Sequence, residues 1–436
     1  MFPSHPDVLC FSHLPWDLVF QRPNHLMSRA ARDRRVFYVE EPQDADRPGL
    51  SMRVREGGVV VVTPMIPARI SGTARETLLR VLVDTLIETE RISNPRVWYY
   101  TPLAVPWTRH IESSAVVYDC MDQLSAFRNA PPELLRLEPE LLARADVVFT
   151  GGHRLYEAKR GSHPEVHPFP SAVDVGHFQT ARRATGDPAD QAKLRRPRIG
   201  YYGVIDERLD LPLIEAIARR RPDWSVILVG PVVKIDPADI PDLPNVHALG
   251  PKPYAELPAY LSGWDVAIMP FARNEATEFI SPTKTPEYLA GGRPVVSTSI
   301  ADVVRPYGEL GLARIADEPD DFIAAIEAAL GEDPATRLAA ADSFLARMSW
   351  DRTWQSMDAI AARAERRRAA RRVAEPVAAP APVRTPVRIP SPSASRAGTA
   401  VSSLGSLSRT SSASSRGASS TATTTATTTA SRGRIE

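Results

Sequence analysis

Short runs of Val, Ile and Tyr alternate with longer amphipathic stretches along most of the chain. This alternation is typical of βαβ units, whose parallel strands are covered on both faces by crossover helices. In the first half it predicts strands at Val8–Ser12, Val36–Glu40, Val59–Thr63, Val97–Tyr100, Val116–Asp119, Val147–Thr150 and Val166–Phe169. In the second half it predicts strands at Arg198–Tyr202, Ser225–Val229, Val246–Leu249, Val266–Met269, Pro294–Thr298 and Ala313–Ile315. The sequence therefore predicts an α/β fold with two parallel sheets.

The segments between these strands predict the helices and the domain boundaries. Residues 1–178 and 198–348 are expected to form two Rossmann-like domains, and 179–197, polar and without apolar period, to link them. From about 370 to 436 the chain is rich first in Arg, Ala and Pro and then in Ser and Thr, a composition typical of a disordered tail. The predicted helices include Leu18–Arg32, Thr73–Ile92, Glu133–Arg144, Leu211–Arg220, Tyr254–Leu261, Pro286–Ala290, Asp320–Leu330, Pro334–Arg347 and Asp351–Ala364.

Composition narrows the class of protein. A formal net charge of +1 over 436 residues gives no field that favours nucleic acid as a partner. The two cysteines, Cys10 and Cys120, end predicted buried strands, so free thiols are expected. The start of the chain has neither the basic segment nor the apolar run of a signal peptide, and a cytoplasmic location is expected. The arginines of 363–372 leave open a peripheral contact with the inner face of the membrane, besides a solvated helix end.

Three strand ends in the second half carry candidate binding residues, because ligands of parallel sheets bind beyond the carboxyl ends of the strands. Gly203 follows the first strand and permits close approach of a phosphate, which Arg208 could contact, and Asp206 could begin the next helix. Gly230 follows the second strand and could lie against a nucleobase or ribose, or form a plain turn.

The third strand end gives the sharpest signal. Lys284 lies in the first turn of a short predicted helix, where the helix dipole prefers anions, so a diphosphate bound there would explain it. Glu287 lies on the same helix face and could accept hydrogen bonds from ribose hydroxyls. Since Pro286 is tolerated only in a first turn, the helix is expected to begin at Thr283 or Thr285.

These residues resemble the donor-site signature of GT-B glycosyltransferases, in particular the glycosyltransferase 4 and group 1 families. Residues 282–296 match the pattern Pro-x-Lys-x-x-Glu-Tyr-x-Ala-x-Gly-x-Pro-Val-Val, and 171–178 and 349–354 are similar to two further family segments. The resemblance implies two Rossmann-like domains facing across a cleft, with a final helix at 349–369 that crosses back onto the first domain. It further implies that Lys284 contacts the diphosphate and Glu287 the ribose of a nucleotide-sugar donor, and that no metal or other cofactor is needed.

One feature departs from the family pattern. The family has a second glutamate eight residues before the one matching Glu287, where this chain has Phe279. It therefore stays open which acid or amide of Asn274–Glu278, if any, contacts the transferring sugar, and Asn274 and Glu278 are the candidates. Ser281 is a further candidate for binding the nucleotide sugar.

The first half is expected to bind the acceptor, a glycan or a lipid-linked precursor. His13, at the end of the first strand, could orient or deprotonate an acceptor hydroxyl, or be a structural loop residue. Asp17 could face the acceptor or cap the next helix, Arg22 could bind an anionic group, and Asp119 could line the cleft. No cluster of His and Cys has the spacing of a metal site.

The resemblance and these candidates together predict a metal-independent glycosyltransferase of EC class 2.4. It would use a nucleoside-diphosphate sugar, by default a UDP-sugar, retain the anomeric configuration, and stabilise the departing diphosphate with Lys284 and Arg208. If the enzyme inverts instead, His13 is the favoured base. Two alternatives stay open: a nucleotide-sugar epimerase on the same fold, and a catalytically degenerate relative that serves as a binding module.

Overall fold

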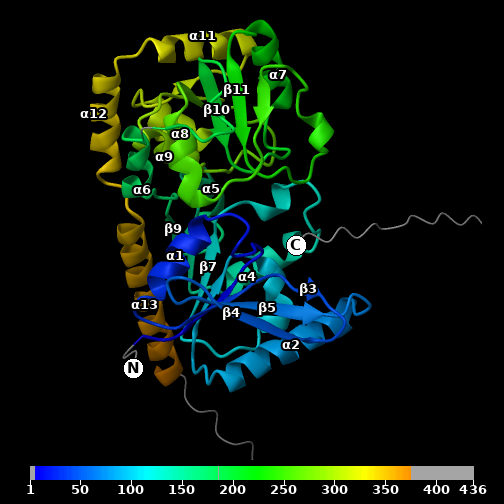
Figure 1. Ribbon diagram of the computed structural model, residues 1–436. Coiled ribbons are helices and arrows are strands. Elements are labelled where there is room, and N and C mark those ends of the chain that lie inside the picture. The colour runs from blue at the N-terminus through cyan, green and yellow to red at the C-terminus, as the bar shows by residue number, and fades with distance from the viewer. Residues whose placement is uncertain (1–4, 185, 375–436) are drawn as a thin grey trace, which may run out of the picture. The chain divides into compact units, whose positions relative to one another are not determined.

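The computed structural model describes residues 5–184 and 186–374, which contain two parallel sheets (Figure 1). The first sheet has nine strands in the order β3-β5-β2-β1-β6-β7-β8-β9, with β4 paired antiparallel to β5. Its strands are β1 Val8–Phe11, β2 Val36–Val39, β3 Gln43–Asp44, β4 Gly49–Val54, β5 Val60–Ile66, β6 Arg96–Tyr99, β7 Ala115–Cys120, β8 Val147–Thr150 and β9 Val166–Pro168. The helices around it are α1 Arg22–Ala30, α2 Gly72–Thr89, α3 Val105–Thr108, α4 Leu134–Arg144 and α5 His153–Lys159.

Alternate residues of β1 serve two separate cores. Leu9 and Phe11 pack with α2 to α5, whereas Val8 and Cys10 pack with α1 and the last helix, α13. Both faces of the strand are therefore buried, which explains its continuous apolar sequence. Cys10 and Cys120 are buried free thiols, as expected.

The sequence analysis missed β3 and β4 and placed the start of α1 too early. β4 presents mostly exposed or half-buried residues, so no apolar run marks it. The helix predicted from Leu18 begins at Arg22, after the N-cap Gln21, and Pro23 fits its first turn. Asp17 therefore caps no helix.

The second sheet has six parallel strands in the order β12-β11-β10-β13-β14-β15. Tight packing at its centre requires Gly200 on β10, because a Cβ there would stand 1.9 Å from the Trp264 ring. The strands are β10 Arg198–Tyr202, β11 Ser225–Val229, β12 Val246–Ala248, β13 Val266–Met269, β14 Val295–Ser297 and β15 Arg314–Ile315. The helices are α6 Val175–Gln179, α7 Leu211–Arg220, α8 Leu257–Ser262, α9 Lys284–Ala290, α10 Ala301–Val303, α11 Pro319–Leu330 and α12 Pro334–Leu345.

The segment expected to be a polar linker contributes to the packing of the second sheet. Gln191 is fully buried and its side-chain oxygen accepts a hydrogen bond from the Trp264 indole at 2.8 Å. Asp187 forms an ion pair with buried Arg198 on β10 at 2.6 Å. These polar contacts hold the segment against the sheet in the absence of an apolar pattern.

Helix α13, Trp350–Ala374, runs back to the first sheet, where it packs on α1, β7 and β8 (Figure 1). It extends past residue 370, so the tail was predicted to begin too early; residues 375–436 lie outside the described residues. None of the helices in the described part of the chain is both long and apolar enough to cross a membrane.

Charge pairs reinforce this return of the chain. Arg34 and Arg96, whose side chains are inaccessible to solvent, donate to the Asp358 carboxylate at 3.2 Å and 2.5 Å. Burial alone raises the pKa of Asp358, but the two guanidinium groups hold it below its usual value. The carboxylate therefore stabilises the fold at neutral pH and loses that contribution as acid protonates it.

We predict that Asp358→Asn destabilises the protein by about 1.5–3 kcal/mol, the cost of losing hydrogen bonds to a charged group. The loss is limited because Arg34 keeps its ion pair with Asp33 and Arg96 its ion pair with Glu365. Thermal and urea unfolding of the full chain measure the change.

The matched control is Asp351→Asn on the same helix. Asp351 pairs with Arg29 and Arg32 but is about half exposed, so its loss is expected to cost less than about 1 kcal/mol. Equal effects of the two variants would contradict the prediction.

Candidate active site

A cavity of about 430 Å³ lies at the carboxyl ends of β10 and β11. The second sheet contributes its floor, through the strand-end glycines and the first turn of α9, and the segment before α1 contributes the opposite wall. Six predicted site residues line it: Asp17, Gly203, Arg208, Gly230, Lys284 and Glu287.

Lys284 is the central charge of this cavity. It is the first residue of α9, whose N-cap is Thr283, within the range predicted. Among the described residues its ammonium group has no ion-pair partner within 4 Å, and it lies 5.6 Å from the Tyr201 ring centre. Burial lowers the pKa of Lys284 to about 8, against the opposing attraction of Glu287. Burial likewise raises the pKa of Glu287 to about 7, although Lys284 opposes that rise.

The two predicted glycines make room for this lysine. Gly203 has φ of +142°, and a Cβ there would stand 2.2 Å from Lys284 Cε. Gly230 has φ of +148°, and a Cβ there would stand 1.8 Å from the Gly203 carbonyl oxygen. Both positions require glycine, because a side chain would be strained and would collide with backbone or with the lysine.

A smaller cavity of about 100 Å³ adjoins the first and shares Gln21, Arg208, Thr283 and Lys284 with it. Ser281 and Arg22 also line it. Arg208 pairs with Asp206 at 2.7 Å, and its guanidinium carbon lies 5.5 Å from the Phe127 ring centre. Asp206 therefore does not begin a helix as expected; Asp210 caps α7 by accepting the Leu213 N–H at 2.9 Å.

Asn274 and Glu278 are not brought to Lys284. They line a different cavity, where the Asn274 side chain donates to the Glu207 carbonyl at 3.2 Å and Glu278 pairs with Arg154 of α5 at 2.7 Å. A contact between either residue and the transferring sugar stays a prediction.

The structure divides the acceptor-side candidates. Arg22 and Asp119 form a buried ion pair at 2.8 Å, with 1% and 0% of their side chains exposed. Asp119 accepts three buried hydrogen bonds from Arg22. It lies beneath the cavities and does not line the cleft. Asp17 stands at the cavity rim, where it pairs with Arg55 and Arg53.

His13 lines neither of these cavities and is half-buried. Its Nδ1 is inaccessible to solvent and has no hydrogen-bond partner among the described residues. Burial lowers the pKa of His13 to about 4, with a hydrogen bond to the Tyr100 backbone opposing. The imidazole is therefore neutral at pH 7.

Comparison with known proteins identifies the second half of the chain. Residues 196–332 match the family described as glycosyl transferases group 1. The match covers this segment and not the whole chain. The matched segment contains every residue that the second half of the chain contributes to the larger cavity, from Tyr202 to Glu287.

One curated relative of this chain is the putative teichuronic acid biosynthesis glycosyltransferase TuaH of Bacillus subtilis (strain 168). The two are 29% identical over 257 residues, which is 54% of this chain and 64% of the relative. The chain thus matches slightly less than two thirds of that relative's length.

Solved structures share the two-sheet arrangement of the GT-B fold. The UDP-forming α,α-trehalose-phosphate synthase from Burkholderia xenovorans aligns with TM-score 0.60 and 13% identity, over 82% of this chain and 98% of its own. Sucrose-phosphate synthase from Thermosynechococcus elongatus aligns with TM-score 0.59 and 16% identity, over 85% and 100%. Anabaena HepE in complex with UDP and glucose aligns with TM-score 0.56 and 15% identity, over 81% and 98%. At these identities the likeness confirms the predicted fold class and nothing finer.

Sequence reasoning missed three residues of these cavities. Asp122 lines the smaller cavity, and burial raises its pKa to about 6 although Arg208, Arg22 and Lys284 oppose that rise. Phe20 and Tyr254 come from different halves of the chain and meet in the larger cavity with ring centres 4.9 Å apart. No local motif marks them, because their meeting depends on how the two sheets pack. Within residues 5–184 and 186–374, no group of three or more His, Cys, Asp or Glu is placed to hold a metal ion.

We predict opposite effects on stability for substitutions of Asp119, which lies on β7, and Asp122, which lies just after it. Asp119→Asn removes the only ion-pair partner of buried Arg22 among the described residues, so unfolding in urea should show a loss of about 3–5 kcal/mol. Asp122→Asn should leave stability at pH 7 unchanged or higher, because burial disfavours the charged form of that carboxyl group. A stable Asp119→Asn variant would show that the buried pair is not structural.

Proposed function

We propose that this chain is a glycosyltransferase that moves a sugar from a nucleoside-diphosphate donor to a hydroxyl group of an acceptor. The observation that carries the proposal is the half-buried Lys284 ammonium group, which faces a cavity at two strand ends and has no ion-pair partner among the described residues. A cation in such a position is stabilised by a bound anion. Because residues 196–332 match the group 1 glycosyltransferase family, we propose that this anion is the diphosphate of a nucleotide sugar.

Each wall of the cavity then has a role in binding the donor. Lys284 and Arg208, with the free N–H groups of the first turn of α9, receive the diphosphate. Glu287 accepts hydrogen bonds from the ribose hydroxyls, and the turn at Gly230 lies beside the base. Ser281 borders the smaller cavity, where we place the transferring sugar.

The reaction follows from these charges. As the bond between the sugar and the diphosphate breaks, negative charge grows on the leaving oxygen, and Lys284 and Arg208 stabilise it without a metal ion. A neutral histidine with a pKa of about 4 is a weak proton acceptor. This favours the retaining course over an inverting one that would use His13 as base.

The donor and acceptor are proposed from the relatives. HepE is described in complex with UDP and glucose, and TuaH is named for teichuronic acid biosynthesis. We therefore propose a UDP-sugar as donor and an envelope polysaccharide, or its lipid-linked precursor, as acceptor. The proposed location is the cytoplasm, with peripheral contact at the inner face of the membrane where the acceptor is lipid-linked.

One observation favours a second candidate, a degenerate relative that only binds nucleotides. Glu278, the acidic residue nearest the family's second glutamate position, is paired with Arg154 instead of facing Lys284. Incubation of UDP-sugars with and without acceptor separates the possibilities. Transfer only with acceptor supports the proposed function, conversion of the donor alone indicates an epimerase, and nucleotide binding without any turnover indicates a binding module.

We predict that Lys284→Ala weakens UDP binding by roughly tenfold to a hundredfold, the loss expected for a charge-assisted hydrogen bond of about 1.5–3 kcal/mol. Isothermal calorimetry on the full chain measures the affinity. Lys193→Ala is the control, because Lys193 is exposed and has no ion-pair partner among the described residues. Undiminished UDP affinity in Lys284→Ala would exclude this donor site.

We predict that UDP affinity falls as the pH is raised from 8 to 9. Lys284 of the free protein loses its proton around pH 8, whereas a bound diphosphate favours the charged lysine, so binding takes up a proton above that pH. The expected decrease approaches tenfold per pH unit, measured by calorimetry in two buffers of different ionisation enthalpy. The slope should disappear in Lys284→Ala, and a slope that persists there would assign the proton to another group.

A further inference from the structure

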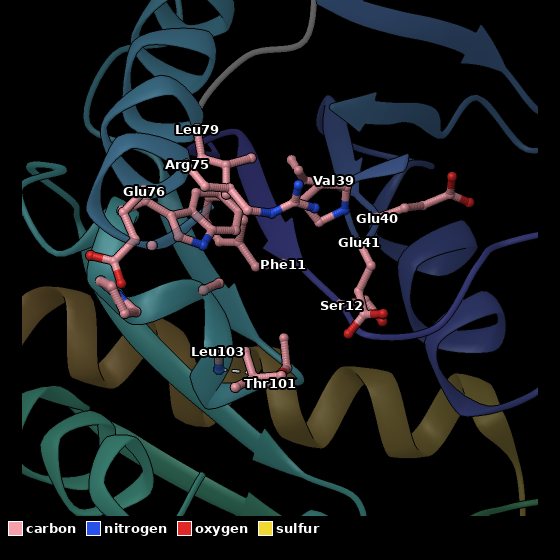
Figure 2. Close-up of a pocket in the computed structure, with 15 residues that line it drawn as sticks. Phe11, Ser12, Val39, Glu40, Glu41, Arg75, Glu76, Leu79, Thr101 and Leu103 are labelled. Atoms are coloured by element: carbon pink, nitrogen blue, oxygen red, sulfur yellow. Dashed lines mark hydrogen bonds between the residues drawn. The ribbon is translucent and has the colours of Figure 1, made fainter. Parts of the chain in front are cut away.

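A second cavity, of about 370 Å³, lies in the first domain and shares no residue with the donor cavities. It opens between the carboxyl ends of β1, β2 and β6 and the first turns of α2 (Figure 2). Its floor is apolar, made largely by Phe11, Val39, Leu79, Leu103 and Trp107. The volume falls within the roughly 300–1,000 Å³ of small-molecule sites.

Three charged side chains at the edge of this floor lack internal partners: half-buried Arg75 and the exposed Glu41 and Glu76. Arg75, Glu41 and Glu76 form no ion pair or side-chain hydrogen bond with any described residue. Figure 2 shows Arg75 reaching from α2 across the opening toward Val39, with Glu41 near Ser12 and Glu76 on the other side. Charged groups that border an apolar cavity without internal partners are what a binding site requires.

The Trp107 indole adds an unpartnered donor within the wall. Only 7% of the residue is exposed, and its ring packs edge-on against Phe11 with centres 5.2 Å apart. Its N–H donates to no acceptor among the described residues. This N–H is not among the buried polar atoms that lack a partner, so it is open to solvent and available to a ligand.

The balance of charge indicates the class of ligand. Glu40 is already satisfied by Arg53, Thr63 and the Trp16 N–H, which leaves one cation, Arg75, against the carboxylates of Glu41 and Glu76. Two carboxylates disfavour a phosphate or another anion, but they accept hydrogen bonds from hydroxyl groups. A sugar ring supplies hydroxyl groups for them, oxygens for Arg75 and the indole, and an apolar C–H face for the aromatic floor.

The second cavity stands next to the donor cavity. The segment from Ser12 to Trp16 separates them, because Ser12 lines the second cavity and Trp16 the donor cavity. Glu40, in the wall of the second cavity, accepts a hydrogen bond from the backbone N–H of Trp16 at 2.6 Å. A glycan chain could therefore occupy both sides of this segment.

We propose that this cavity binds a saccharide unit of the acceptor, remote from the unit whose hydroxyl group receives the new sugar. The inference rests on the proposed function and deepens it, since it makes the acceptor a glycan of more than one unit.

The test is saturation-transfer NMR on the full chain saturated with UDP. The probes are the methyl glycosides of glucose, galactose, mannose, N-acetylglucosamine and glucuronic acid, added one at a time at millimolar concentration. We expect at least one probe to bind, and Arg75→Ala and Trp107→Phe each to weaken it by roughly tenfold, the loss of one hydrogen bond to a charged or buried group. Arg80→Ala is the matched control on α2, because exposed Arg80 does not line the cavity.

The outcomes separate the two proposals. UDP affinity, measured by calorimetry, should be the same in Arg75→Ala as in the unchanged protein. If neither protein binds UDP, the proposed function alone is refuted. The saccharide site is refuted if UDP binds but no glycoside does, or if glycoside binding survives both cavity variants. It is also refuted if inorganic phosphate displaces the glycoside, which would make the cavity an anion site.

Discussion

The cavity at the edge of the second sheet depends on one cation, Lys284, which has no ion-pair partner among the described residues. Lys284 lies where β10 and β11 end. A Cβ at Gly203 would collide with the lysine side chain, and a Cβ at Gly230 would collide with the backbone of Gly203. The depressed pKa of Lys284 and the raised pKa of Glu287 express the same cost of burial. A bound anion would relieve that cost for the lysine.

The rest of the chain keeps this edge in place. Asp302, from the second domain, accepts the backbone N–H groups of His153 and Arg154 at the start of α5, each at 2.9 Å. A Cβ on Gly152 would stand 2.1 Å from that carboxylate, so the first domain also needs a glycine at this contact. The Arg154–Glu278 pair lies beside it. Glu278 is thus engaged in joining the two domains, which accounts for its distance from Lys284.

The first domain carries two kinds of charge, and burial tells them apart. The Arg22–Asp119 pair and the arginines around Asp358 are enclosed and mutually satisfied, so they serve the fold. Arg75, Glu41 and Glu76 border an open cavity and have no partners among the described residues. Carboxylates and guanidinium groups of the same kinds therefore act structurally in one place and face ligand space in another.

The sequence by itself determined the fold class and most of the strands, and it marked Lys284 and Glu287, which the structure places in one cavity. Strands buried on both faces must be continuously apolar, and a lysine in a first helical turn, followed three residues later by a glutamate, is legible without coordinates. The hydrophobic pattern of the sequence could not reveal β4, because its residues are largely exposed. It also did not reveal the start of α1, which is set by Gln21 and Pro23.

Only the tertiary structure decided which charges are structural and which face a cavity. Arg22 meets Asp119 across 97 residues of chain, and Glu278 meets Arg154 across 124. Phe20 joins Tyr254 only because the two sheets pack together. Hydrophobic periodicity records how each segment meets its own sheet, whereas the pairing of distant side chains depends on the crossover of strands and the packing of domains. That information resides in no local stretch of sequence.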